Sequence, residues 1–146
     1  MNKLIFLFLV LTSFGFAQNK NIYSKKGFAI EGYDVVSYFD NKAEKGNSEF
    51  AVEHEGSTFL FTSKEHLELF KNSPEKYLPE YGGYCAYGVA AKNKKFPINP
   101  TTFEIRNDKL YLFYNAWGTN TLDSWLKEKP DNLVKKGDIN WKNLTN

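Results

Sequence analysis

The chain has 146 residues, of which 42% are hydrophobic and 17% are aromatic. Its 19 Lys and Arg against 17 Asp and Glu leave a formal net charge of +2, with no basic block or basic helix face, so we expect no nucleic-acid partner. A chain of this length and ring content suits one compact domain that builds its core without cross-links.

The N-terminus has the layout of a secretory signal peptide over residues 1–17. Lys3 gives a positive start, residues 4–11 form an unbroken apolar run, and the small residues Gly15 and Ala17 precede a cleavage point before Gln18. The apolar run is shorter than the roughly 20 residues of a membrane span. We therefore expect an exported protein, periplasmic or secreted, with no transmembrane segment in its mature chain.

The first half of the mature chain predicts short extended segments. Residues 18–26 are polar and predict a flexible lead-in, which is followed by a domain over residues 27–146. Residues 35–39 are rich in β-branched and aromatic residues and predict a strand. Two further apolar runs, 50–55 and 58–61, predict a hairpin, because Phe and polar residues alternate in the second run.

Two short helices are predicted next. Residues 62–65 read Thr-Ser-Lys-Glu, a capping-box sequence that predicts a helix start, with His66 and Phe70 near one face. Ser73 followed by Pro74 predicts a second helix, because proline is tolerated at the first helical position.

The second half predicts a helix of small residues, a second hairpin and two further helices. The fold class that follows is α+β: a small single domain with two β-hairpins forming an antiparallel sheet packed against several short helices, including C-terminal ones. The elements are the helix 85–91, the strands 103–106 and 110–114 around an Asn-Asp turn, the amphipathic segment 117–127, and a final helix within 131–144 that Gly137 could break.

Several ordered sequence blocks resemble the YHS domain family, and in particular its exported single-domain members. The blocks are GYDVVSYF at 32–39, residues 56–63 and 66–70, PEKYLPEYGGYCAYG at 74–88, and KLYL at 109–112. The likeness runs from about residue 27 to residue 144. It implies a YHS-type domain, a type that occurs beside copper-transporting ATPases and certain oxygenases and is linked to metal binding. Members with that link carry several cysteines, whereas this chain has Cys85 alone.

Cys85 and His66 are the candidate metal ligands. A single cysteine cannot form an internal disulfide, so the thiol of an exported protein needs another explanation. A position near a helix start favours a thiolate, which suits metal binding or redox chemistry, while tight packing among small residues remains an alternative. One thiol and two imidazoles are too few for a closed zinc site, whereas Cu(I) accepts fewer, softer ligands. Copper is therefore the first cofactor to test.

Tyrosines around the Gly82-Gly83 pair are the candidate small-ligand residues. Tyr81, Tyr84 and Tyr87 lie three residues apart, a spacing that could line one side of a pocket with apolar rings and polar hydroxyls. Packing of the same rings in a core is the alternative. Asp34 is interpreted as the cap of a turn.

The sequence leads to three hypotheses for function. The first is an exported YHS-type binding module that handles a metal ion, copper first, or a small ligand near Cys85. The second is a thiol-redox protein that uses Cys85. The third is a structural or partner-binding domain in which Cys85 is packed. No nucleophile and base can be identified as a pair, so no enzyme activity is assigned.

Overall fold

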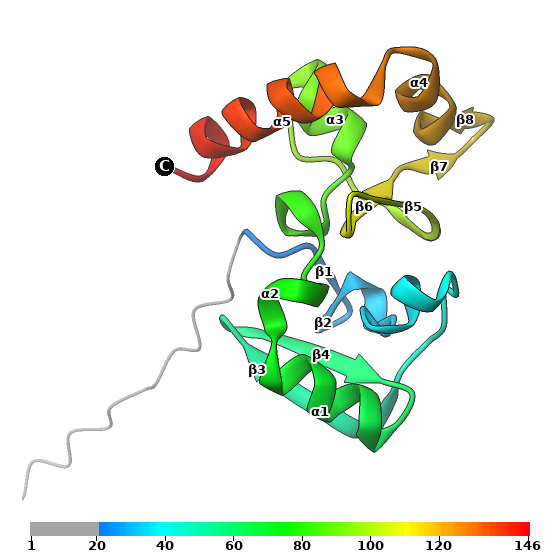
Figure 1. Ribbon diagram of the computed structural model, residues 1–146, viewed down its shortest axis with the longest axis vertical. Coiled ribbons are helices and arrows are strands. Elements are labelled where there is room, and N and C mark those ends of the chain that lie inside the picture. Colours follow the sequence, from blue (N-terminus) through cyan, green and yellow to red (C-terminus); the bar gives the residue numbers. More distant parts are fainter. Residues whose placement is uncertain (1–20) are drawn as a thin grey trace, which may run out of the picture.

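The computed structural model describes residues 21–146, and the predicted signal peptide lies outside the described residues. The fold is α+β, as predicted (Figure 1). Its strands are β1 Ser24–Lys25, β2 Phe28–Ala29, β3 Asn47–His54, β4 Ser57–Phe61, β5 Asn99–Arg106, β6 Lys109–Phe113, β7 Asn115–Ala116 and β8 Thr119–Asn120. Its helices are α1 Lys64–Asn72, α2 Pro74–Tyr77, α3 Ala86–Lys92, α4 Thr121–Lys127 and α5 Pro130–Thr145, with 3₁₀ helices η1 Ile30–Gly32, η2 Ser37–Asp40 and η3 Glu80–Gly83.

The two predicted hairpins are both present and both antiparallel, but they belong to separate sheets. The first hairpin, β3–β4, joins a four-stranded sheet in the order β1-β2-β4-β3, in which β2 runs parallel to β4. The second, β5–β6, forms a sheet of its own and turns at Asn107 and Asp108, both with positive φ. In Figure 1 the second hairpin lies between the first sheet and the C-terminal helices, apart from the strands of the first sheet.

Strand β6 separates two hydrophobic cores. Its side chains alternate, so that Leu110 and Leu112 belong to one core while Tyr111 and Phe113 belong to the other. The N-terminal core gathers buried residues from the first sheet, η1 and α1, among them Ile30, Phe59, Phe61 and Phe70. The C-terminal core gathers buried residues from α3, α4 and α5, among them Val89, Trp125 and Leu133. A strand buried on both faces explains the continuous run Leu-Tyr-Leu-Phe.

The predicted flexible lead-in does not hold for the part of residues 18–26 that the structure describes. Ile22 and Tyr23 are buried in the N-terminal core. The Tyr23 amide donates to the Gly82 carbonyl at 2.8 Å, and the Ile30 amide donates to the Tyr23 carbonyl at 2.9 Å. The two buried side chains and the two backbone hydrogen bonds hold the segment against η1 and η3, so the folded domain includes it.

The strand predicted over residues 35–39 is wrong. Val35 and Val36 are buried, as their apolar character suggested, but the backbone turns into η2 instead. Asp34 causes the turn, because its Oδ1 accepts hydrogen bonds from the amides of Val36 at 2.8 Å and Ser37 at 3.2 Å. The interpretation of Asp34 as a turn cap is confirmed.

Helix α1 begins one residue later than the capping-box pattern predicts. Ser63 is the N-cap, and its Oγ accepts from the His66 amide at 3.1 Å. The Thr62 hydroxyl is used elsewhere, since it donates to Asp34 Oδ2 at 2.8 Å. The following helix, α2, begins at Pro74 as predicted.

The segment predicted as one amphipathic helix over 117–127 is split. Trp117 and Gly118 form the turn between β7 and β8, with φ of 53° and 76°, and Trp117 is 97% exposed. Helix α4 starts only after Asn120, whose side chain accepts from the Leu122 amide at 3.1 Å. The amphipathic pattern holds for residues 121–127, and the preceding Trp-Gly pair lies outside the helix.

Helix α5 is continuous through Gly137. The Tyr81 ring occupies the space that a side chain at position 137 would need, so the glycine serves close packing and does not break the helix. No helix within residues 21–146 is long and apolar enough to cross a membrane.

Candidate functional site

The two predicted metal ligands lie in different parts of the molecule. His66 is in the first turn of α1, and Cys85 directly precedes α3. Figure 1 shows these two helices at opposite ends of the fold. Each side chain has its own polar partners, so the structure offers two separate candidate sites.

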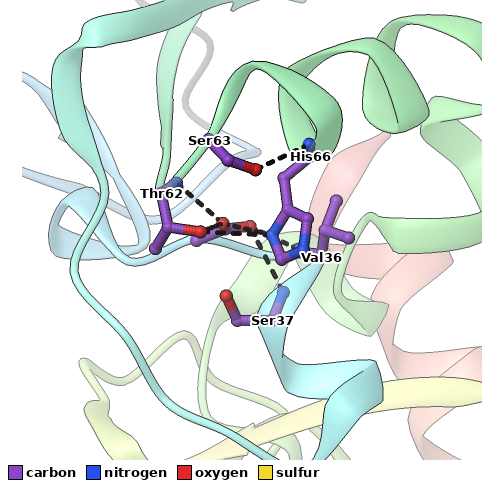
Figure 2. A network of polar contacts seen from close by, with 6 residues as sticks. Val36, Ser37, Thr62, Ser63 and His66 are labelled. Carbon is purple, nitrogen blue, oxygen red and sulfur yellow. Dashed lines mark hydrogen bonds and ion pairs between the residues drawn. The ribbon is translucent and has the colours of Figure 1, made fainter.

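The first site is a network around the buried carboxylate of Asp34 (Figure 2). The side chain is fully buried, and it accepts hydrogen bonds at both oxygens. Oδ1 takes the Val36 and Ser37 amides, while Oδ2 takes the Thr62 amide at 2.9 Å and the Thr62 hydroxyl at 2.8 Å. His66 Nδ1 lies 2.7 Å from the same Oδ2. The carboxylate thus connects the turn before η2 to the start of α1.

Asp34 is ionised at neutral pH. Burial acts most strongly and raises its pKa, but the hydrogen bonds from Thr62 and His66 together outweigh burial, and the pKa is held below its ordinary value. An ionised carboxylate only accepts hydrogen bonds, so Nδ1 of His66 must carry the proton between them. Asp34 therefore fixes the orientation of the imidazole ring.

The second ring nitrogen of His66, Nε2, has no partner among the described residues. The side chain is 20% exposed. A carboxylate that orients one nitrogen while the other stays available is a common arrangement behind metal-binding histidines. However, no group of three or more His, Cys, Asp or Glu side chains in residues 21–146 could hold a metal ion together. A copper site built on His66 and Cys85 stays a prediction, and the geometry gives it no direct support.

The second site surrounds Cys85. The thiol is 1% exposed, and its sulfur lies 3.2 Å from Thr121 Oγ1 and 3.4 Å from the Gly88 amide nitrogen. Thr121 donates its hydroxyl proton to the Tyr114 carbonyl at 2.9 Å. Because that proton is already used, the thiol itself donates to Thr121 Oγ1.

A pocket of about 510 Å³ opens beside Cys85, and we call it the Cys85 pocket. It lies between α3, the loop that follows it, β8 and the start of α4. Three other hollows of the described part have volumes of about 220 to 280 Å³, and neither Cys85 nor His66 lines them. The residues that line the Cys85 pocket are Cys85, Tyr87, Gly88, Lys92, Phe96, Pro97, Tyr114, Thr119, Thr121 and Ser124.

The lining residues differ in burial, and we use this difference to name a floor, walls and a mouth of the pocket. Cys85 and Gly88 are buried and form its floor. Tyr87, Tyr114 and Thr121 are half-buried and form its walls, whereas Lys92, Phe96, Pro97 and Thr119 are exposed and surround the mouth. Gly88 is required at the floor, because a side chain there would collide with the Phe96 ring.

Of the three predicted tyrosines, Tyr87 lines the Cys85 pocket. Its hydroxyl donates to Glu128 at 2.8 Å. Tyr81 belongs to the C-terminal core instead, where its hydroxyl donates to the Val134 carbonyl at 3.2 Å and to Asp138 at 3.1 Å. Burial, followed by the charge of Asp138, raises the pKa of Tyr81, so the hydroxyl stays protonated.

Tyr84 packs in a cluster of rings on another side of the fold. Its ring contacts Tyr23 edge-on at 5.6 Å and Trp141 at 6.1 Å between centroids, and the Lys95 ammonium lies 5.4 Å from its centre. Although the three tyrosines are three residues apart in the sequence, their rings lie in three different surroundings. The chain between Tyr81 and Tyr87 is not one continuous helix, which explains the divergence.

Most residues of both sites were missed by sequence reasoning. Thr121 meets Cys85 across 36 positions of the chain, and Asp34 meets His66 across 32. No local spacing signals such pairs. A weak signal existed for Phe96 and Pro97, since they begin a short apolar run, Phe-Pro-Ile, directly after polar loop residues.

Comparison of the chain with protein-family models, with curated proteins and with solved structures found no match.

Proposed function

We propose that the protein is an exported YHS-type binding module that takes a small, mostly apolar molecule in the Cys85 pocket. The observation that carries the proposal is the pocket itself, with its volume of about 510 Å³ at the predicted candidate residue. Small-molecule sites in proteins commonly have volumes of about 300 to 1,000 Å³ and mainly apolar walls.

The lining chemistry supports an apolar occupant. The rings of Tyr87, Phe96 and Tyr114 and the ring of Pro97 line the pocket. The polar groups at depth are already paired, since the Cys85 thiol bonds to Thr121 and the Thr121 hydroxyl bonds to Tyr114. An occupant would therefore gain free energy mainly by burying apolar surface against these rings.

The role of Cys85 in this proposal is that of a floor residue. Its thiol is nearly inaccessible, and the chain has no second cysteine with which it could exchange. A thiol-redox activity would need an outside partner that reaches the floor of the pocket. A thiol that is nearly inaccessible gives less support to that alternative than to a binding role.

The test is a fluorescence titration of the mature protein with N-phenyl-1-naphthylamine, a neutral apolar probe that emits strongly in apolar surroundings. We expect saturable enhancement with one probe per chain. Ser124→Phe fills the pocket from its wall and should weaken probe binding at least tenfold. Thr119→Phe narrows the mouth from an exposed position and serves as a second filling variant in case Ser124→Phe fails to fold.

The matched control is Ser48→Phe, which adds the same ring at an exposed position on β3. It should bind the probe as the wild-type chain does, and thermal unfolding should show that each variant is folded. No saturable binding by the wild-type chain, or equal binding by both folded filling variants, would overturn the proposal.

A further inference from the structure

We propose that the occupant of the Cys85 pocket is an apolar carboxylate, held with its apolar body inside and its anionic group at Lys92. This inference rests on the proposed binding function and deepens it by naming the ligand class. It follows from two features of the pocket: an unpaired cation lies at its mouth, and no unpaired charge lies at its floor.

Lys92 is the cation at the mouth. It lines the pocket, is exposed, and has no hydrogen bond or ion pair to any described residue. It is also the last residue of α3, where a positive charge is favourable to the helix end. The ammonium group has no charged partner in the described part of the chain that would neutralise it. An anionic group at the mouth would be its complement.

The floor offers no such partner. Cys85 donates to Thr121, and Thr121 donates to the Tyr114 carbonyl, so the donors at the floor are committed to the protein itself. A charged group placed there would lose its hydration without compensation. The charged end of a ligand therefore belongs at the mouth, and its apolar end belongs at the floor.

A negative charge also touches the pocket wall, through the hydrogen bond from the Tyr87 hydroxyl to Glu128. Glu128 itself does not line the pocket, and its oxygen already accepts this bond. The hydrogen bond from Tyr87, followed by burial, raises the tyrosine pKa, so the hydroxyl stays neutral. Among the residues that line the Cys85 pocket, Lys92 is the one that carries a charge.

The experiment compares three competitors with the same 12-carbon chain, all below their aggregation concentrations at pH 7.5. Dodecanoate, dodecan-1-ol and dodecylamine are each titrated against the neutral probe N-phenyl-1-naphthylamine bound to the wild-type protein. Dodecanoate should displace it at about threefold lower concentration than the alcohol, the size expected of one exposed ion pair. The amine should be the weakest of the three. High salt should reduce the advantage of the carboxylate.

Variants of the cation sharpen the test. Lys92→Gln should make dodecanoate no better than dodecan-1-ol, while Lys92→Arg should keep the preference. Lys136→Gln removes the same charge from an exposed position on α5 and should change nothing.

The outcomes separate the two proposals. Equal displacement by carboxylate and alcohol, unchanged in Lys92→Gln, overturns the carboxylate inference and leaves the apolar pocket standing. No binding of the probe or of any competitor overturns the binding function and this inference together.

Discussion

The Asp34 network and the Cys85 pocket each contain a buried, hydrogen-bonded side chain, but they differ in the space around it. In the Asp34 network a fully buried carboxylate accepts five hydrogen bonds, and the groups that donate them surround it. In the Cys85 pocket a buried thiol is also hydrogen-bonded, but about 510 Å³ beside it is unfilled by protein. An open pocket of this volume lies within the range of about 300 to 1,000 Å³ that is common for small-molecule sites.

The difference separates a polar cluster that supports the fold from one beside which we propose that a ligand binds. Asp34 and His66 hold the turn before η2 against the start of α1, and their loss should be felt as lost stability. Groups around the Cys85 pocket make fewer hydrogen bonds, so their loss should cost less stability. Four predictions test this contrast.

The largest expected effect is on Asp34. Asp34→Ala leaves the buried Thr62, Val36 and Ser37 amides without their acceptor and should lower the free energy of unfolding by about 3 kcal/mol. Urea unfolding followed by circular dichroism measures this change. The matched control, Asp40→Ala at the exposed end of η2, should change stability by less than about 0.5 kcal/mol. Equal effects of the two substitutions would show that the network is not structural.

Acid should weaken the same network. The pKa of Asp34 is lower in the folded chain than in the unfolded chain, so its stabilisation is fully present above the unfolded value of about 3.9. It is lost as the pH falls through the folded value. Urea unfolding between pH 5 and pH 2, below the range in which a free histidine titrates, should show the stability gap between wild type and Asp34→Ala closing. A gap that stays constant down to pH 2 would contradict the assignment.

A smaller effect is expected at the pocket wall. Thr121→Val keeps the shape of the side chain but removes the hydroxyl that joins Cys85 to Tyr114, and should cost about 1 kcal/mol of stability. Binding of N-phenyl-1-naphthylamine should persist, because the pocket keeps its volume. Thr119→Val at the exposed mouth is the control and should leave stability unchanged within about 0.5 kcal/mol. A loss of stability as large as that of Asp34→Ala would contradict the proposed difference between the two regions.

The smallest effect separates the backbone of Ser37 from its side chain. The Ser37 amide donates to Asp34, but its buried hydroxyl has no hydrogen-bond partner among the described residues. Ser37→Ala keeps the amide and removes the unpaired hydroxyl, so stability should stay unchanged or rise by about 1 kcal/mol. Thermal unfolding measures the shift. A clear loss of stability would mean that the hydroxyl has a role in the network after all.

Local signals predicted the elements well where one short segment decides its own structure. The Phe59–Phe61 alternation gave the first hairpin, and Pro74 marked the start of α2. The same reasoning was wrong at residues 35–39, where the apolar, β-branched run indicated a strand. There a single side chain, Asp34, directs the backbone into a turn by taking two amides that a strand would have used.

The candidate site was predicted in part. Cys85 and Tyr87 both line the pocket, whereas Tyr81 and Tyr84 serve packing, and His66 pairs with Asp34. Sequence spacing alone could not predict which tyrosine lines the pocket, because the backbone changes direction between Tyr81 and Tyr87 through residues of positive φ.

The amino-acid sequence by itself determined the α+β class, both hairpins and most helices of this protein, because hydrogen bonding and hydrophobic periodicity act over a few residues. Only the tertiary structure decided that Leu110 and Tyr111 face different cores, that His66 meets Asp34, and that Thr121 closes over Cys85. Contacts between distant segments depend on how whole elements pack, and the space left between α3, β8 and α4 exists only once they have done so.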